Sequence, residues 1–335
     1  MQICYLIAFP DSDEGKAPAP EQLKVSKDAP YFQPVDIDLV SLGEETVLIE
    51  GFAVTATRQR YDAHVQMVEC RFDLSDPFAS SVLQARVKIQ AALQSRYIPE
   101  AIRQSGLFED YTILLVQTAK PTPEKWIDKN SASLAKFIRS QRETLNPVEI
   151  NEILISRTQY SASELTLVDW EGAIIISPAE DYTSDIALLK IGNYQLLRYR
   201  MLDQSIDTML DKINETFFQN KRRPNATRGM IRQIAEHRIE VMLNFERAEQ
   251  NLLLIGDWYT AKLYDVIHSE LYLKAWKQNV KDKLDNLENI VETIKENFAT
   301  SWEGLMERAE LVGWVLLLVG YLYLFFVDDL ASIAK

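Results

Sequence analysis

The pattern of hydrophobic and polar positions divides the chain into two parts near residue 180. In the first part, short apolar runs typical of strands alternate with apolar residues at helical spacing. This pattern predicts an α+β body over residues 1–180, with an α/β arrangement as the alternative. We predict strands at Gln2–Phe9, Val35–Val40, Thr46–Phe52, Tyr111–Gln117, Glu149–Ser156 and Leu165–Ser177, and helices over Pro77–Tyr97 and Thr122–Arg142.

The second part has almost only helical spacing. Residues 181–255 are predicted to form helices that pack on the body, with a break at Gly256–Asp257. Residues 256–308 are predicted to form a coiled-coil-like stalk, because their apolar residues recur at steps close to seven per two turns. The predicted seam is Val280, Leu284, Leu287, Val291, Ile294, Phe298 and Leu305. The alternative is an antiparallel hairpin with the helix around Ile231–Ile255, which would bury the seam inside one chain.

The stalk leads into Leu311–Val327, an apolar run without a charged residue. At about 1.5 Å per helical residue it spans roughly 25 Å, close to the hydrocarbon core of a bilayer. It predicts one transmembrane helix over residues 309–329, a short tail at 330–335 and an N-terminal domain in the cytoplasm. The residues assigned to this anchor are Leu311, Trp314, Leu317, Tyr321, Phe325 and Val327. A buried helix in a protein core is the alternative.

Charge and cysteine content narrow the expected partners. The formal net charge of −13 offers no excess of basic residues for a nucleic-acid backbone, so no nucleic-acid partner is expected. Two cysteines, Cys4 and Cys70, make no disulfide framework and are interpreted as buried thiols. The expected partners are a lipid bilayer and either a second copy of the chain or another protein.

Sequence motifs for catalysis are absent. The chain contains no GxxxxGK[ST], GxGxxG, HExxH or GxSxG pattern, and we predict no catalytic residue, no metal ligand and no cofactor. Asp169 and Glu171 flank Trp170, and such paired carboxylates could hold a ligand or form the solvated face of a strand. Arg198 and Arg200 follow in a mixed polar and apolar helix. These four residues are the candidates for a small-molecule site.

The C-terminal part resembles the required-for-meiotic-nuclear-division family, a domain of unknown function. The residues that carry the resemblance are Gly256, Asp257, Leu263, Tyr264, Trp276, Lys283, Leu284, Arg308, Glu310, Trp314 and the apolar run after them. The resemblance implies membrane anchoring and self-assembly, and it transfers no active-site residue. A mitochondrial role known in one branch does not fit the N-terminus, which lacks a transit peptide.

Together these observations predict a non-catalytic, C-terminally anchored scaffold that self-associates or recruits partners through its helical stalk. The alternative is a membrane-tethered enzyme or ligand sensor. Its site would lie between the α+β body and the helix over residues 186–217.

Overall fold

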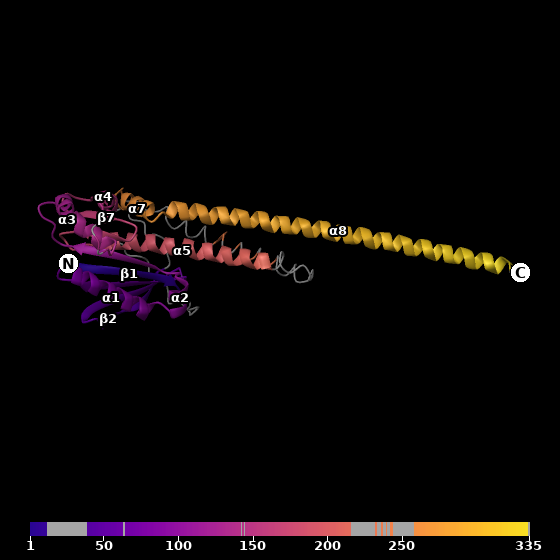
Figure 1. Cartoon of the computed structure of the whole chain (residues 1–335), viewed down its shortest axis with the longest axis horizontal. Coiled ribbons are helices and arrows are strands. Elements are labelled where there is room, and N and C mark those ends of the chain that lie inside the picture. The colour runs from indigo at the N-terminus through magenta and orange to yellow at the C-terminus, as the bar shows by residue number, and fades with distance from the viewer. Residues whose placement is uncertain are drawn as a thin grey trace. The chain divides into compact units, whose positions relative to one another are not determined.

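The computed structural model describes residues 1–11, 39–62, 64–141, 143, 145–215, 232, 236, 239, 242, 243 and 258–333, without the side chains of 80, 294–308 and 321–333. The chain forms two compact units. The first comprises Met1–Thr208 and Val241–Lys281, and the second comprises Met209–Glu240 and Asp282–Lys335. Figure 1 labels their helices and strands. The domain boundaries expected near residues 180, 255 and 308 remain a prediction.

The first unit is built on one eight-stranded sheet with the strand order β2-β3-β4-β1-β5-β8-β7-β6. All neighbouring strands are antiparallel except β5 and β8, which are parallel. The unit is therefore a mixed α/β structure, and the predicted α+β class is wrong. The strands are β1 (Gln2–Pro10), β2 (Leu39–Ile49), β3 (Phe52–Tyr61), β4 (Val65–Asp73), β5 (Glu109–Val116), β6 (Arg157–Thr158), β7 (Leu165–Val168) and β8 (Gly172–Ile176).

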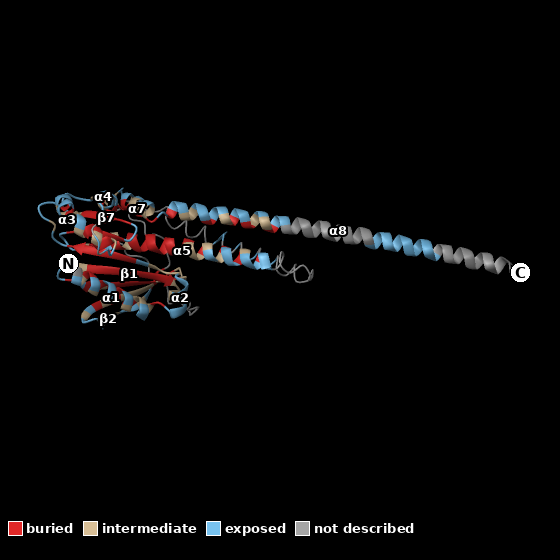
Figure 2. Ribbon diagram, viewed as in Figure 1, coloured by how far each residue is buried: buried red, intermediate tan, exposed pale blue. Residues whose placement is uncertain are grey.

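Helices cover both faces of the sheet, and Figure 1 shows α1 and α5 on opposite sides of β1. Ile3, Tyr5 and Ile7 of β1 belong to the main hydrophobic core, together with Leu93 of α1 and Phe137 of α3. Because both faces are covered, β1 is an almost continuous apolar run, and Figure 2 shows it as buried. The helices are α1 (Ser80–Tyr97), α2 (Glu100–Ser105), α3 (Pro123–Ile138), α4 (Pro147–Ile153), α5 (Thr183–Ile213), α7 (Trp258–Glu270) and α8 (Leu273–Ile333).

A buried polar layer lies between α5 and the opposite face of the sheet. Lys190 of α5 forms an ion pair with Glu69 of β4 and donates a hydrogen bond to Gln59 at 3.2 Å. Arg71 holds the same carboxylate, with its Nε 2.5 Å from the Oε1 of Glu69. Burial alone raises the pKa of Glu69, but Lys190 and Arg71 outweigh it and lower that pKa below its usual range. The layer thus fixes α5 on the sheet through charge.

Local backbone signals explain two errors of the sequence prediction. The strand predicted over Thr46–Phe52 is interrupted, because it runs through the turn between β2 and β3. Glu50 and Gly51 both have positive φ, 51° and 84°, which is the two-residue hairpin turn that joins β2 to β3. The strand predicted over Glu149–Ser156 is wrong, because Pro147–Ile153 is helix α4. Asn146 caps this helix by accepting a hydrogen bond from the Val148 N–H at 3.0 Å, and Pro147 occupies its first position.

The second unit includes the end of α5 and most of α8. Met209 and Ile213 of α5 pack with Leu287 and Val291 of α8 in a small buried cluster. The predicted seam is therefore packed inside the chain at these positions, but its partner is α5. The helix expected as the partner, around Ile231–Ile255, lies almost entirely outside the described residues.

The predicted membrane anchor is wrong. In the part of the chain that the structure describes, no helix is long and apolar enough to cross a membrane. The apolar run between Glu310 and Asp328 is at the short end of the lengths that cross a bilayer core, and it is one stretch of the longer, charged helix α8. The predicted transmembrane helix, single-pass location and tail-anchored class are therefore all wrong.

Candidate functional site

The structure places Asp169 and Glu171 in the tight turn between β7 and β8. The Oδ2 of Asp169 accepts a hydrogen bond from the Glu171 N–H at 3.1 Å. Both carboxylates pair with Arg139, at 3.2 Å for Asp169 and 3.4 Å for Glu171. Burial raises the pKa of Asp169, against the opposing effects of these neighbours. Asp169 is engaged by this ion pair, whereas the more exposed Glu171 also lines a pocket.

Arg198 and Arg200 of α5 do not join that pair. Arg200 forms an ion pair with Glu109 at the start of β5 and donates hydrogen bonds to the carbonyls of Phe108 at 3.1 Å and Gly106 at 2.8 Å. Arg198 is buried beside Tyr194 on the same helix. The four sequence candidates thus belong to three separate interactions. Their role as a ligand site remains a prediction.

A pocket of about 260 Å³ lies where β5 and β8 begin. We call it the amino-edge pocket and define it by Gln90, Asp110, Thr112, Trp170, Glu171 and Asn193. Its walls come from α1, the first residues of β5, the β7–β8 turn and α5. Gly172 fits here because a Cβ at this position would lie 2.6 Å from the Thr112 carbonyl oxygen. The pocket therefore depends on close backbone packing of β8 against β5.

Of the residues that define this pocket, the sequence predicts Glu171 as a candidate and does not single out Gln90 or Asp110. Asp110 is the second residue of β5, where an acidic pair precedes a strongly apolar strand. This acidic pair could have indicated a site, because a carboxylate at the first positions of a central strand lies at the end of that strand, where the sheet meets solvent. No local signal marks Gln90, which looks like any polar residue of an amphipathic helix.

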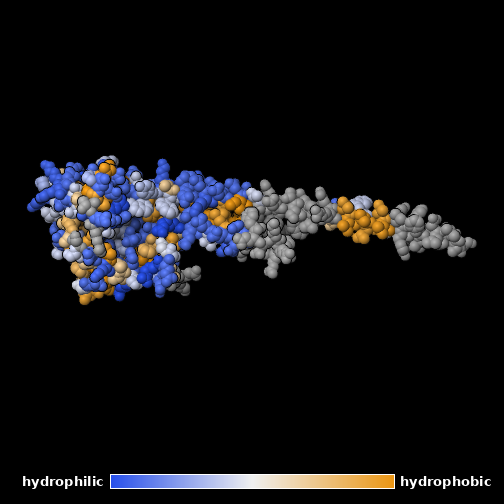
Figure 3. All heavy atoms as spheres, in the orientation of Figure 1, coloured by the Kyte–Doolittle hydropathy of each residue, from blue (hydrophilic) through white to orange (hydrophobic). Residues whose placement is uncertain are grey.

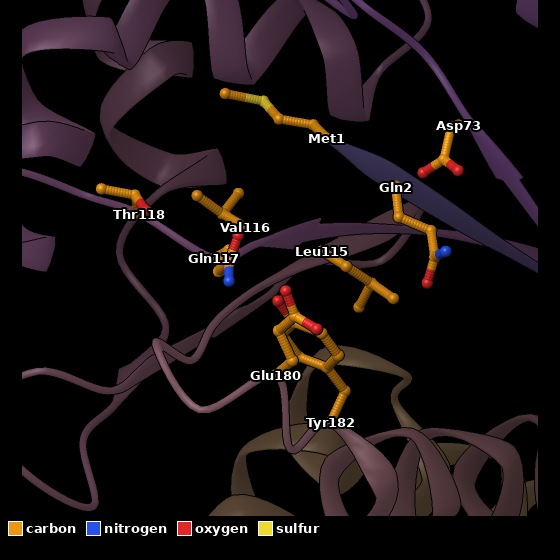
Figure 4. A pocket seen from close by; sticks show the side chains of 9 residues that line it. All are labelled: Met1, Gln2, Asp73, Leu115, Val116, Gln117, Thr118, Glu180 and Tyr182. Carbon is orange, nitrogen blue, oxygen red and sulfur yellow. The ribbon is translucent and has the colours of Figure 1, made fainter.

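A second pocket, of about 390 Å³, lies at the opposite edge of the sheet. We call it the carboxyl-edge pocket, and its polar lining includes Gln2, Asp73, Gln117, Thr118 and Glu180. Figure 4 shows Gln2 and Asp73 on one side of it and Glu180 with Tyr182 on the other. The chain leaves β5 toward α3 on one face and β8 toward α5 on the other, which is where ligands often bind in α/β sheets. However, Asp73, Gln117, Thr118 and Glu180 are all exposed.

Helix α8 carries the largest exposed apolar surface among the described residues. Eight large apolar side chains between Leu311 and Val319 are 52–69% exposed. Figure 3 shows this segment as an orange patch on α8. Of the residues assigned to the anchor, Leu311, Trp314 and Leu317 are exposed here, and the side chains of Tyr321, Phe325 and Val327 lie outside the description.

The predicted seam of α8 continues into this exposed segment. Val280, Leu284, Leu287 and Val291 are buried, and the side chains of Ile294, Phe298 and Leu305 lie outside the description. Val312 and Val319 keep the seven-residue spacing of Leu284 and Val291. Val315 keeps that of Val280 and Leu287, with the polar residues Ser301 and Arg308 at two positions in between. The face that is buried near the start of α8 is therefore exposed farther along.

Comparison with known proteins identifies a relative for more than half of the chain. The uncharacterized protein MJ0711 of Methanocaldococcus jannaschii is 26% identical over 195 residues, which cover 58% of this chain. The match spans 60% of that relative's length. No solved structure matches the chain.

The family comparison corrects the resemblance drawn from the C-terminal part. The matching family is described as "Uncharacterized protein MJ0711, N-terminal domain", and its match covers residues 7–183. These residues hold the whole sheet from Ile7 onward and end at the start of α5. Short C-terminal patterns such as Gly256–Asp257 and the apolar run are too unspecific to define a family, and the assignment to the required-for-meiotic-nuclear-division family is wrong. The chain belongs to the family of the MJ0711 N-terminal domain.

Proposed function

We propose that this protein is a non-catalytic assembly protein that pairs with a second copy of itself through α8. The observation that carries the proposal is the exposed apolar surface between Leu311 and Val319. A contiguous apolar patch of this kind on a protein surface marks an interaction site. The proposal keeps the self-association expected from the sequence and does not include an anchor.

The seam indicates how the helices pair. Near the start of α8, Leu287 and Val291 are covered by Met209 and Ile213. Among the described side chains, Val312, Val315 and Val319 have no such cover. Two copies of α8 in parallel bring identical seam positions together and bury them.

A second copy is favoured over an unrelated partner by the chemistry of the segment. Between Leu311 and Val327 no charged residue occurs, so two identical helices lie side by side without like-charge repulsion. Nothing lies within 4 Å of a Cβ built at Gly313 or Gly320, so the helix is open on that side as well.

The expected mass of the full chain in solution is at least twice the 38.5 kDa of one copy, measured by light scattering after size exclusion. Val315→Asp with Val319→Asp places two charges in the seam and should reduce the mass toward that of one copy. Gly313→Asp with Leu317→Asp is the matched control, with the same charge and spacing on the opposite face of the helix. An unchanged mass in the seam variant, or equal loss in both, would contradict the proposal.

A further inference from the structure

The amino-edge pocket contains hydrogen-bond acceptors that no described residue of the protein uses. Asn193 is 2% exposed, and its Nδ2 donates to the Leu189 carbonyl at 2.8 Å. Because only the amide nitrogen can donate, the orientation of the side chain is fixed. Its Oδ1 accepts no hydrogen bond within the described residues and is available to the pocket. This oxygen is not among the fully enclosed polar atoms that lack a partner, so it is open to the solvent of the pocket, and a bound donor takes the place of that water.

A second buried amide in this pocket has the same feature. Gln90 of α1 is 8% exposed, and its Nε2 donates to the Thr112 hydroxyl at 2.7 Å. In the part of the chain that the structure describes, its Oε1 accepts no hydrogen bond. The amides of Gln90 and Asn193 reach one pocket from helices on opposite faces of the sheet. Both offer acceptors to it.

The charged residues that line the pocket are all acidic. Three carboxylates line it, from Glu109, Asp110 and Glu171, and no lysine, arginine or histidine is among its described lining residues. Glu109 is paired with Arg200, and Glu171 with Arg139. Asp110 has no ion pair among the described residues, and its Oδ2 accepts one hydrogen bond from the Tyr5 hydroxyl at 2.8 Å. Partial burial of its carboxyl group raises the pKa of Asp110, against hydrogen bonds from Tyr5 and Gln94 that lower it, although the residue as a whole is exposed.

This lining excludes several ligand classes. An anion such as phosphate finds no positive side chain in it. The described residues contain no group of three side chains that could hold a metal ion. A ligand that carries positive charge and only donates hydrogen bonds fits the amide oxygens and carboxylates of this lining. Trp170, whose ring packs at 5.6 Å against Tyr272, adds a partly exposed aromatic wall of the kind that binds organic cations.

We propose that the amino-edge pocket binds a small aliphatic amine as its ammonium ion, with Asp110 as counter-ion and the Asn193 Oδ1 as hydrogen-bond acceptor. A volume of about 260 Å³ is large enough for such a molecule, since one water takes about 30 Å³ in the liquid. The site is independent of assembly through α8, because all its residues lie in the first unit.

The test is calorimetric titration of the full chain with 1,4-diaminobutane, agmatine and spermidine in about 150 mM salt, which screens the general attraction of a protein with net charge −13. At least one amine should bind, and the neutral 1,4-butanediol should bind at least about tenfold more weakly. Asp110→Asn keeps an acceptor for Tyr5 but removes the charge, and Asn193→Leu removes the free oxygen. Each should weaken binding at least about tenfold.

Asp73→Asn is the matched control, because it removes one carboxylate from the carboxyl-edge pocket. It should leave amine binding unchanged. Thermal unfolding of each variant separates a lost contact from a lost fold. Three results would overturn the proposal: no binding of any amine at millimolar concentration, equal weakening by Asp73→Asn and Asp110→Asn, or displacement of the amine by millimolar magnesium or phosphate.

Discussion

Lys190→Met is expected to lower the free energy of unfolding by about 3 kcal/mol at pH 7. The Lys190 and Glu69 side chains are only 9% and 10% exposed, and their ion pair lies between α5 and the sheet. Removing one partner leaves a buried carboxylate without its nearest cation, which costs more than the pair itself contributes. Arg71 keeps one contact with Glu69, so the effect stays at the lower end of the usual range. Urea unfolding measures it.

The effect should depend on pH in a defined direction. The pKa of Glu69 is lowered in the folded protein, so its contribution is fully present above the unfolded pKa, about 4.3, and is lost as pH falls through the folded pKa. In Lys190→Met the largest lowering charge is gone, and burial raises the carboxyl pKa instead. The difference between variant and wild type should therefore shrink as pH falls from 7 toward 4.

Two further variants separate charge from general disruption. Lys212→Met removes an exposed lysine from the same helix and should change stability by no more than about 0.5 kcal/mol. Glu69→Gln combined with Lys190→Met removes the charge on both sides and should recover part of the loss. Equal effects of Lys190→Met and Lys212→Met would show that the buried pair does not fix α5.

Strand β1 could be predicted from sequence because its apolar run is local and unbroken. Gln2–Phe9 was predicted, and Gln2–Pro10 is observed. The run Leu165–Ser177 was predicted as strand, and it is a hairpin whose turn holds Asp169 and Glu171. The alternation of side chains along a single strand therefore does not describe how these two carboxylates are placed, because they lie in a turn.

The amino-edge pocket could not be predicted, for a physical reason. Gln90 and Asn193 lie far apart in sequence and meet only because α1 and α5 pack on opposite faces of the sheet. Asp110 and Glu171 meet because β5 and β8 pair in parallel, and such a register is set by long-range contacts. A single sequence carries no local mark of that pairing.

The length of the terminal apolar run does not by itself distinguish a membrane anchor from an interface between helices. Its lack of charge and span of roughly 25 Å favoured an anchor. The predicted seam ends at Leu305. Val312, Val315 and Val319 keep its seven-residue spacing, with Ser301 and Arg308 at two positions before Val315. The continued spacing gives the run an interpretation as an interface between helices, and that interpretation can be tested residue by residue.

Val315→Cys is expected to form disulfide-linked dimers as the main product under mild oxidation. In a parallel two-stranded coil, identical seam residues face each other closely enough for a disulfide, which requires Cα atoms about 4.4–6.8 Å apart. The native thiols should not interfere. Cys4 and Cys70 are fully buried, and burial raises the pKa of Cys70 to about 12 and that of Cys4 further, so neither forms a reactive thiolate. Non-reducing gel electrophoresis measures the dimer.

Leu317→Cys is the matched control, because Leu317 is exposed and lies on the opposite face of α8 from Val315. It should give only background cross-linking. Equal yields at both positions would mean random collision of exposed thiols, and no cross-link at Val315 would exclude a parallel, in-register pair. A result specific to Val315 places the contact on the same face that Met209 and Ile213 cover nearer the start of the helix. The seam would then have one function throughout α8: burial against a helix, first within the chain and then between chains.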